Sequence, residues 1–175
     1  MIAGSWARVH FPSGELELRK HLSLLFRLAL LIGSTVAAVA QTQHITAFTG
    51  TWKFNVAKST FNPGPPFKSF TLTFTPDGVR HLDLIGANGQ PLKAALPWSD
   101  GKEVAVEAAE GNLANVKAVS RIRGRSFRDI WRADGKVIEK VHGVVSSDGQ
   151  TLTVTVEGPT QQGGAFHNRV VFDKQ

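Results

Sequence analysis

The 175-residue sequence lacks cysteine altogether. Disulfide bonds are therefore excluded even if the protein is exported, and so is a lipid anchor attached through a cysteine. One core region is apparent, which favours a single domain. Residues 41–175 are numerous enough to bury a core without covalent cross-links.

Recognisable catalytic motifs are also missing. The histidines after residue 40 are His44, His81, His142 and His167, and none has the His-x-His or His-Glu-x-x-His spacing of a metal site. No Gly-x-Ser-x-Gly elbow and no glycine-rich loop leading into a helix is present. We therefore expect no metal, no cofactor and no enzymatic activity. An enzyme would need His81 or Asp129 within hydrogen-bond reach of another titratable group in an open cavity.

Long hydrophobic runs are scarce, and the main one lies near the N-terminus. A basic stretch, residues 19–21, precedes LSLLFRLALLIGSTVAAVA, which is interrupted only by Arg27 and ends on the small-x-small pattern Ala38-Val39-Ala40. Its uninterrupted part is shorter than the roughly 20 residues that cross a bilayer. Residues 1–40 are therefore predicted to be an N-terminal extension with a cleaved signal peptide. An uncleaved anchor and an N-terminal helix of the fold are the alternatives.

Cleavage after Ala40 would leave a moderately basic domain, residues 41–175. It has 16 Lys and Arg against 12 Asp and Glu, a net charge of +4. Such a balance does not by itself indicate a nucleic-acid partner, and none is expected. The domain is predicted to be secreted or periplasmic, with no stable membrane span. Residues 1–18 resemble an over-extended translation start more than part of a signal peptide.

The remaining chain shows no helical periodicity and consists of short alternating runs. In KSFTLTFT (68–75), Phe70, Leu72 and Phe74 alternate with threonines, as in a half-buried strand. Turn-forming pairs such as Asn88-Gly89 separate the runs. The pattern predicts about eight to ten strands joined by hairpins.

A hairpin meander of this length exposes two strand edges unless it closes on itself. We therefore predict an all-β fold, an antiparallel up-and-down meander closed into a barrel. A two-sheet β-sandwich is the alternative. No repeat of about 40 residues is visible, so a propeller is not expected.

The stretch FTGTWKF (48–54) resembles the glycine-x-tryptophan opening of the calycin barrels, which include lipocalins and fatty-acid-binding proteins. GTWKFNVAKSTFNPGPP, TLTFTPDG, SDGQTLTVT and the closing VVFDK are similar to small secreted bacterial lipocalin-like proteins. The resemblance covers residues 41–175. It implies a single lipocalin-like barrel that holds an apolar ligand, such as a lipid, in its interior.

Two features of the fatty-acid-binding proteins are absent. Those proteins insert a helix pair after the first strand, but here the interval contains Pro63, Gly64, Pro65 and Pro66, which prevent a continuous helix. Their final strand carries an Arg-x-Tyr pair that holds a carboxylate. This sequence reads RVVF at 169–172 and has no tyrosine. We therefore do not expect it to hold a carboxylate in that way.

Strand parity predicts which side chains enter the barrel. Trp52 is expected to close its base, where its ring can also meet an arginine. Other residues on these inward faces include Leu92, Leu152, Val154, Val156 and Val170. The apolar candidates for ligand contact are Trp52, Phe70, Leu72, Phe74, Leu82, Leu84, Leu96, Trp98, Phe127, Trp131, Phe166 and Phe172.

Three polar residues share the inward faces: Arg80, Asp129 and Asn168. An unpaired buried charge is costly, so Arg80 and Asp129 are expected to pair, to reach solvent or to meet a ligand. Apolar walls with a few polar groups are typical of small-molecule cavities. All three are candidate ligand contacts, and internal hydrogen bonding or a position at the rim is the alternative.

Arginines are densest between residues 121 and 132. Alternation places Arg121 and Arg123 opposite Ala118 and Ile122, as on a solvated outer face. Together with Arg125 they form a candidate basic face for an anionic surface or a protein partner.

The sequence thus predicts a secreted or periplasmic lipocalin-like barrel that binds a small apolar molecule. The alternative is a structural or interaction barrel, also non-enzymatic, with a packed interior and a partner on its arginine-rich face. A cavity in the interior would distinguish the two.

Overall fold

Eleven antiparallel strands form one sheet in the part of the chain that the structure describes. The structure is a computed structural model that describes residues 45–111, 113–160 and 162–175. The predicted signal peptide, residues 1–40, lies outside these ranges. The elements are β1 (Gly50–Phe54), the 3₁₀ helix η1 (Val56–Lys58), β2 (Ser69–Phe74), β3 (Val79–Ile85), β4 (Pro91–Pro97), β5 (Glu103–Ala105), β6 (Glu107–Glu110), β7 (Val116–Arg123), β8 (Ser126–Ala133), β9 (Lys136–Val145), β10 (Thr151–Pro159) and β11 (Ala165–Lys174).

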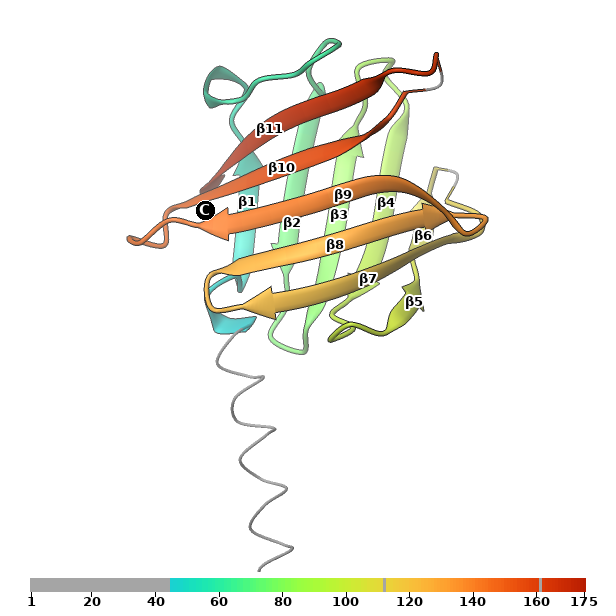
Figure 1. Ribbon diagram of the computed structural model, residues 1–175. Coiled ribbons are helices and arrows are strands. Elements are labelled where there is room, and N and C mark those ends of the chain that lie inside the picture. The colour runs from blue at the N-terminus through green and yellow to red at the C-terminus, as the bar shows by residue number, and fades with distance from the viewer. Residues whose placement is uncertain (1–44, 112, 161) are drawn as a thin grey trace, which may run out of the picture. The chain divides into compact units, whose positions relative to one another are not determined.

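The sheet is a meander whose first and last strands pair with each other. Consecutive strands pair antiparallel within two groups, β1 to β4 and β7 to β11. Strand β11 then pairs with β1, with Lys174 opposite Trp52 and Phe172 opposite Phe54. In Figure 1, β7–β11 cross in front of β1–β4, and the two groups enclose the interior. The prediction of an antiparallel barrel is confirmed, and the β-sandwich is not observed.

The residues between β4 and β7 connect the two ends of the sheet, β5 and β6. Strand β5 pairs with β7, and β6 pairs with β4. Val106 lies between them, is buried, and donates its N–H to the carbonyl oxygen of Val116 at 3.0 Å. The run from 103 to 110 therefore pairs first with β7 and then with β4. Because Val106 divides this run into two strands, the sheet has eleven strands.

The base of the barrel, the end where β1 begins and β2 ends, is filled with aromatic rings. Trp52 is fully buried there, and its indole N–H donates to the carbonyl oxygen of Phe48 at 2.7 Å. The Phe48 ring centroid lies 5.5 Å from that of Phe127, and Phe74 stacks on Trp98 at 5.8 Å. Lys174 places its Nζ 5.1 Å from the centroid of the Trp52 ring. The cation on this indole is therefore a lysine, and the expectation of an arginine there was wrong.

The interval between β1 and β2 is irregular apart from η1. The predicted absence of a helix pair is confirmed, since the described residues 55–68 contain only these three helical residues. Hydrogen bonds hold this loop against β11: the N–H of Asn62 donates to Asn168 Oδ1 at 3.0 Å, and the N–H of His167 donates to the carbonyl oxygen of Asn62 at 2.7 Å. Its two phenylalanines, Phe61 and Phe67, pack edge-to-face on each other.

Within the described residues, no helix is both long and apolar enough to cross a membrane.

Candidate ligand-binding cavity

The interior of the barrel contains a cavity of about 480 Å³ above the aromatic base. Cavities that hold small organic ligands measure roughly 300–1,000 Å³. Five of its lining residues are polar, and the others are apolar, so the wall is mostly aliphatic and aromatic. The lining comprises Pro63, Phe67, Phe70, Leu72, Arg80, Leu82, Leu84, Leu92, Leu113, Phe127, Asp129, Trp131, Ile138, Glu139, Val141, Val154, Val156, Thr160, Phe166, Asn168, Val170 and Phe172.

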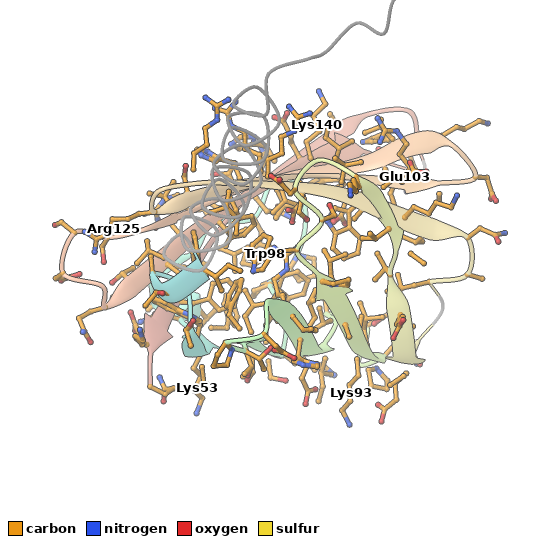
Figure 2. The ribbon with its side chains drawn as sticks, turned by 90° about the horizontal axis from the view of Figure 1, so that it is seen from below. Lys53, Lys93, Trp98, Glu103, Arg125 and Lys140 are labelled. Carbon is orange, nitrogen blue, oxygen red and sulfur yellow. The ribbon has the colours of Figure 1, made fainter. Side chains whose placement is uncertain are left out.

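Strand alternation explains how the wall forms. Phe70 and Leu72 of β2 lie opposite Leu84 and Leu82 of β3, so their side chains project to the same side of the sheet. The intervening residues face outward. Figure 2, seen from below, shows Trp98 within the ring of strands, whereas Lys53 and Lys93 point away from it.

Most of the residues predicted to enter the barrel line this cavity. They are Phe70, Leu72, Arg80, Leu82, Leu84, Phe127, Asp129, Trp131, Phe166, Asn168 and Phe172. The other four lie in the packed part of the interior. Trp52, Phe74 and Trp98 belong to the aromatic base, and Leu96 packs with Ala94 and Ala118.

Seven lining residues were not predicted to face inward: Pro63, Phe67, Leu113, Ile138, Glu139, Val141 and Thr160. Parity could have found two of them, because Glu139 and Val141 alternate in phase with the buried Val145. Ile138 is out of phase with them. The register between β8 and β9 shifts after Trp131, a bulge that brings two consecutive residues of β9 to the cavity. The remaining four lie in loops, where alternation carries no information.

Arg80 and Asp129 form an ion pair in the interior. Arg80 Nη2 lies 2.5 Å from Asp129 Oδ2, and both residues are buried. The guanidinium carbon is 4.8 Å from the centroid of the Phe127 ring and 5.0 Å from that of Trp98. Aromatic faces attract a cation, so these rings and the carboxylate together compensate the buried charge of Arg80.

Three buried polar atoms of cavity-lining residues have no hydrogen-bond partner in the protein. They are Arg80 Nε, Asp129 Oδ1 and Trp131 Nε1. An unsatisfied buried donor or acceptor costs about 1–3 kcal/mol. The unpartnered hydrogen-bonding atoms therefore lie at the same part of the cavity wall as the Arg80–Asp129 ion pair.

Glu139 adds a third charged group to the wall. It lies directly opposite Trp131 across β8 and β9 and is partly buried. Burial raises the pKa of Glu139 from 4.5 to about 7, because the ionised carboxylate loses hydration there. No charge or hydrogen bond among the described residues contributes to this shift.

Asn168 has a structural role in this arrangement. Its Oδ1 accepts the hydrogen bond from Asn62 described above, which fixes the proline-rich loop over β11. Pro63 and Phe67 of that loop reach the cavity wall. Asn168 thus supports one side of the cavity as well as lining it.

The described residues hold no cluster of three or more His, Asp or Glu side chains that could bind a metal ion. His81 is exposed on the outer side of β3. Asp129 does lie within hydrogen-bond reach of Arg80, but arginine stays protonated in proteins and has no proton to exchange. This pair therefore offers no general acid–base chemistry.

The candidate basic face lies outside the barrel. Arg121, Arg123 and Arg125 are all exposed, and Arg121 lies opposite Arg128, another exposed residue, across β7 and β8. Arg125 Nη2 donates to the carbonyl oxygen of Ser147 at 2.6 Å.

No protein-family model matches the chain, and no curated protein sequence matches it either. Among solved structures, it is similar to a mutant of the fluorescent protein UnaG, with 16% identity and a TM-score of 0.48 over 74% of this chain and 97% of that one. A zebrafish ileal bile-acid-binding protein in complex with cholic acid gives 14% identity and a TM-score of 0.48 over 74% and 99% of the two chains. Likenesses this weak carry no argument about family or ligand. The strand order and its closure through β1 and β11 decide the architecture instead. The fold is an antiparallel up-and-down β-barrel.

Proposed function

We propose that this barrel binds a small apolar molecule in its interior cavity. The observation that carries the proposal is the cavity itself, about 480 Å³ in volume, with seventeen apolar residues in its lining and few polar ones. Transfer of an apolar molecule from water to such a wall is favourable by roughly 25 cal/mol for each Å² of apolar surface buried.

The alternative of a packed interior does not hold for this part of the barrel. The aromatic base is filled, but the region above it is hollow. A protein whose barrel served only as a scaffold would gain stability by filling that space, because a cavity of this kind forfeits packing contacts.

Extraction of natively purified protein with organic solvent, followed by mass spectrometry, tests the proposal. We expect a co-purifying apolar compound that is absent from extracts of heat-unfolded, washed protein. If the extracts are empty and apolar probes do not bind to the purified barrel, the proposal is wrong.

We further propose that the protein is exported and matures by cleavage after Ala40. The support is the signal-like run of residues 19–40, which lies outside the described part of the chain. Sequencing the N-terminus of protein recovered from the medium or the periplasm should give Gln41. Recovery of full-length protein from the cytoplasm alone would contradict export.

The arginine-rich face remains a candidate partner surface. Its exposed guanidinium groups support contact with an anionic surface. Charge reversal of Arg121, Arg123 and Arg125 to glutamate should then abolish capture on anionic vesicles. Unchanged capture would remove this role.

A further inference from the structure

The polar groups of the cavity are concentrated on one part of its wall. Asp129 and Trp131 are two residues apart on β8 and so face the same side, and Glu139 of β9 lies opposite Trp131. We call Asp129, Trp131 and Glu139 the polar strip. Arg80 of β3 reaches it from across the barrel through its ion pair with Asp129.

The charges on the wall are poorly suited to an anionic ligand. Arg80 is the one cation among the described lining residues, and Asp129 already neutralises it. Glu139 brings the net charge of the lining to −1 when ionised and to zero when protonated. A carboxylate in this cavity would lose its hydration and would meet two acidic groups without a free cation.

The unpartnered hydrogen-bonding atoms point to a neutral polar group. Arg80 Nε and Trp131 Nε1 are donors, and Asp129 Oδ1 is an acceptor. A hydroxyl or a primary amide both donates and accepts, whereas an ionised carboxylate only accepts. Neighbouring atoms cover these three atoms at the wall surface, so a hydrogen bond to a ligand requires a small rotation of the lining side chains.

We propose that the cavity selects neutral molecules with an apolar body and a hydroxyl or amide group, which hydrogen-bonds to the polar strip. Long-chain carboxylates are discriminated against. The inference rests on the proposed function, because it specifies which apolar molecules the same cavity takes.

Nile red is a neutral dye whose emission rises in apolar surroundings. It allows the binding of apolar molecules by the cavity and the selectivity for neutral polar groups to be tested separately. Binding of Nile red to the purified full chain tests the cavity. Competition by decanol and by decanoic acid at about pH 8 tests the selectivity. We expect decanol to displace the dye at a concentration at least about tenfold lower than decanoic acid, the ratio expected from one uncompensated buried group.

Any apolar cavity binds an alcohol more tightly than a carboxylate of the same chain length. The decisive test is therefore a comparison of decanol binding by two variants. Trp131→Phe keeps a ring but removes the lining N–H, and it should weaken decanol binding about five- to tenfold while Nile red binding is unchanged. Trp98→Phe is the matched control. Its indole N–H is also buried without a partner, but Trp98 does not line the cavity. This variant should bind decanol as the wild type does.

The outcomes separate cleanly. If decanoic acid competes as well as decanol, or if Trp131→Phe binds decanol with wild-type affinity, the selectivity inference is wrong and the cavity proposal stands. If neither Nile red nor either of the two compounds binds, the cavity proposal fails, and the inference fails with it.

Discussion

Arg80 and Asp129 neutralise each other inside the barrel: Nη2 and Oδ2 are 2.5 Å apart, and the two side chains are 4% and 0% exposed. They lie on β3 and β8, which are far apart in the order of the sheet, so the pair joins opposite walls. Removing either partner leaves an uncompensated buried charge.

Single substitutions in this pair should therefore be costly. We expect Arg80→Met and Asp129→Leu each to lower the free energy of unfolding by about 3–5 kcal/mol. The double variant should lose less than either single variant, because it buries no charge at all. Urea denaturation of the wild type, the two single variants and the double variant measures this double-mutant cycle, and additive losses would contradict the coupling.

Glu139 should make stability depend on pH. Its pKa rises from 4.5 to about 7 on folding, so the folded state binds the proton more tightly than the unfolded state does. The resulting stabilisation is complete below about pH 4.5 and is lost as the pH rises through about 7. Glu139→Gln should flatten this dependence, and at pH 8 its free energy of unfolding should exceed that of the wild type by up to about 3 kcal/mol.

Urea melts across this pH range check the prediction, and Glu157→Gln provides the control. Glu157 lies on the neighbouring strand β10 but is exposed. Its Oε1 is 3.9 Å from Lys140 Nζ and its Oε2 is 3.8 Å from His167 Nδ1, both exposed contacts that contribute little to stability. Its substitution should leave the pH profile close to that of the wild type. Parallel profiles for the wild type and Glu139→Gln would show that burial does not perturb Glu139.

Gly143 allows Phe127 to sit between the base and the cavity. A Cβ at Gly143 would lie 2.0 Å from Phe127 Cε1, and the ring cannot move away because it is buried against Phe48 and Trp98. Gly143→Ala should cost about 1–3 kcal/mol through overpacking. In the background of Phe127→Leu the same change should cost clearly less, as thermal melts of the four proteins would show. An equal cost in both backgrounds would rule out this clash as the cause.

Trp52 should support the barrel and not the ligand. Trp52→Phe leaves the Phe48 carbonyl without its donor, which should lower stability by about 1–3 kcal/mol, with a further loss from the smaller ring. Nile red affinity, measured where the variant is fully folded, should not change. A large loss of affinity would place Trp52 in the binding site after all.

Sequence alone predicts the barrel and much of its wall for a simple reason. When one face of a strand is buried and the other is solvated, alternation identifies the inward residues, as it does for Phe70 and Leu72. The same rule placed Arg80 and Asp129 in the interior. Pairing was one of three outcomes expected for these two charges. The sequence could not decide among the three, because the choice depends on which strands face each other across the barrel.

Alternation also cannot tell which inward residues line a cavity. Trp98 and Phe127 both face inward, and their ring centroids are 5.4 Å apart, yet only Phe127 reaches the hollow region. That difference depends on how the aromatic rings fill the base. Ile138 was missed because a bulge changes the register, and Phe67 because it lies in a loop.

The central claim is that the hollow region binds the ligand, and filling it tests that claim most directly. Val156 of β10 lines the cavity, whereas its neighbour Thr155 lies on the opposite face of the same strand. Val156→Trp should weaken Nile red binding by more than about tenfold, a loss of about 1.4 kcal/mol, while Thr155→Trp binds as the wild type does. Circular dichroism should show both variants folded. Equal binding by a folded Val156→Trp variant and the wild type would show that the molecule binds elsewhere and would contradict the account.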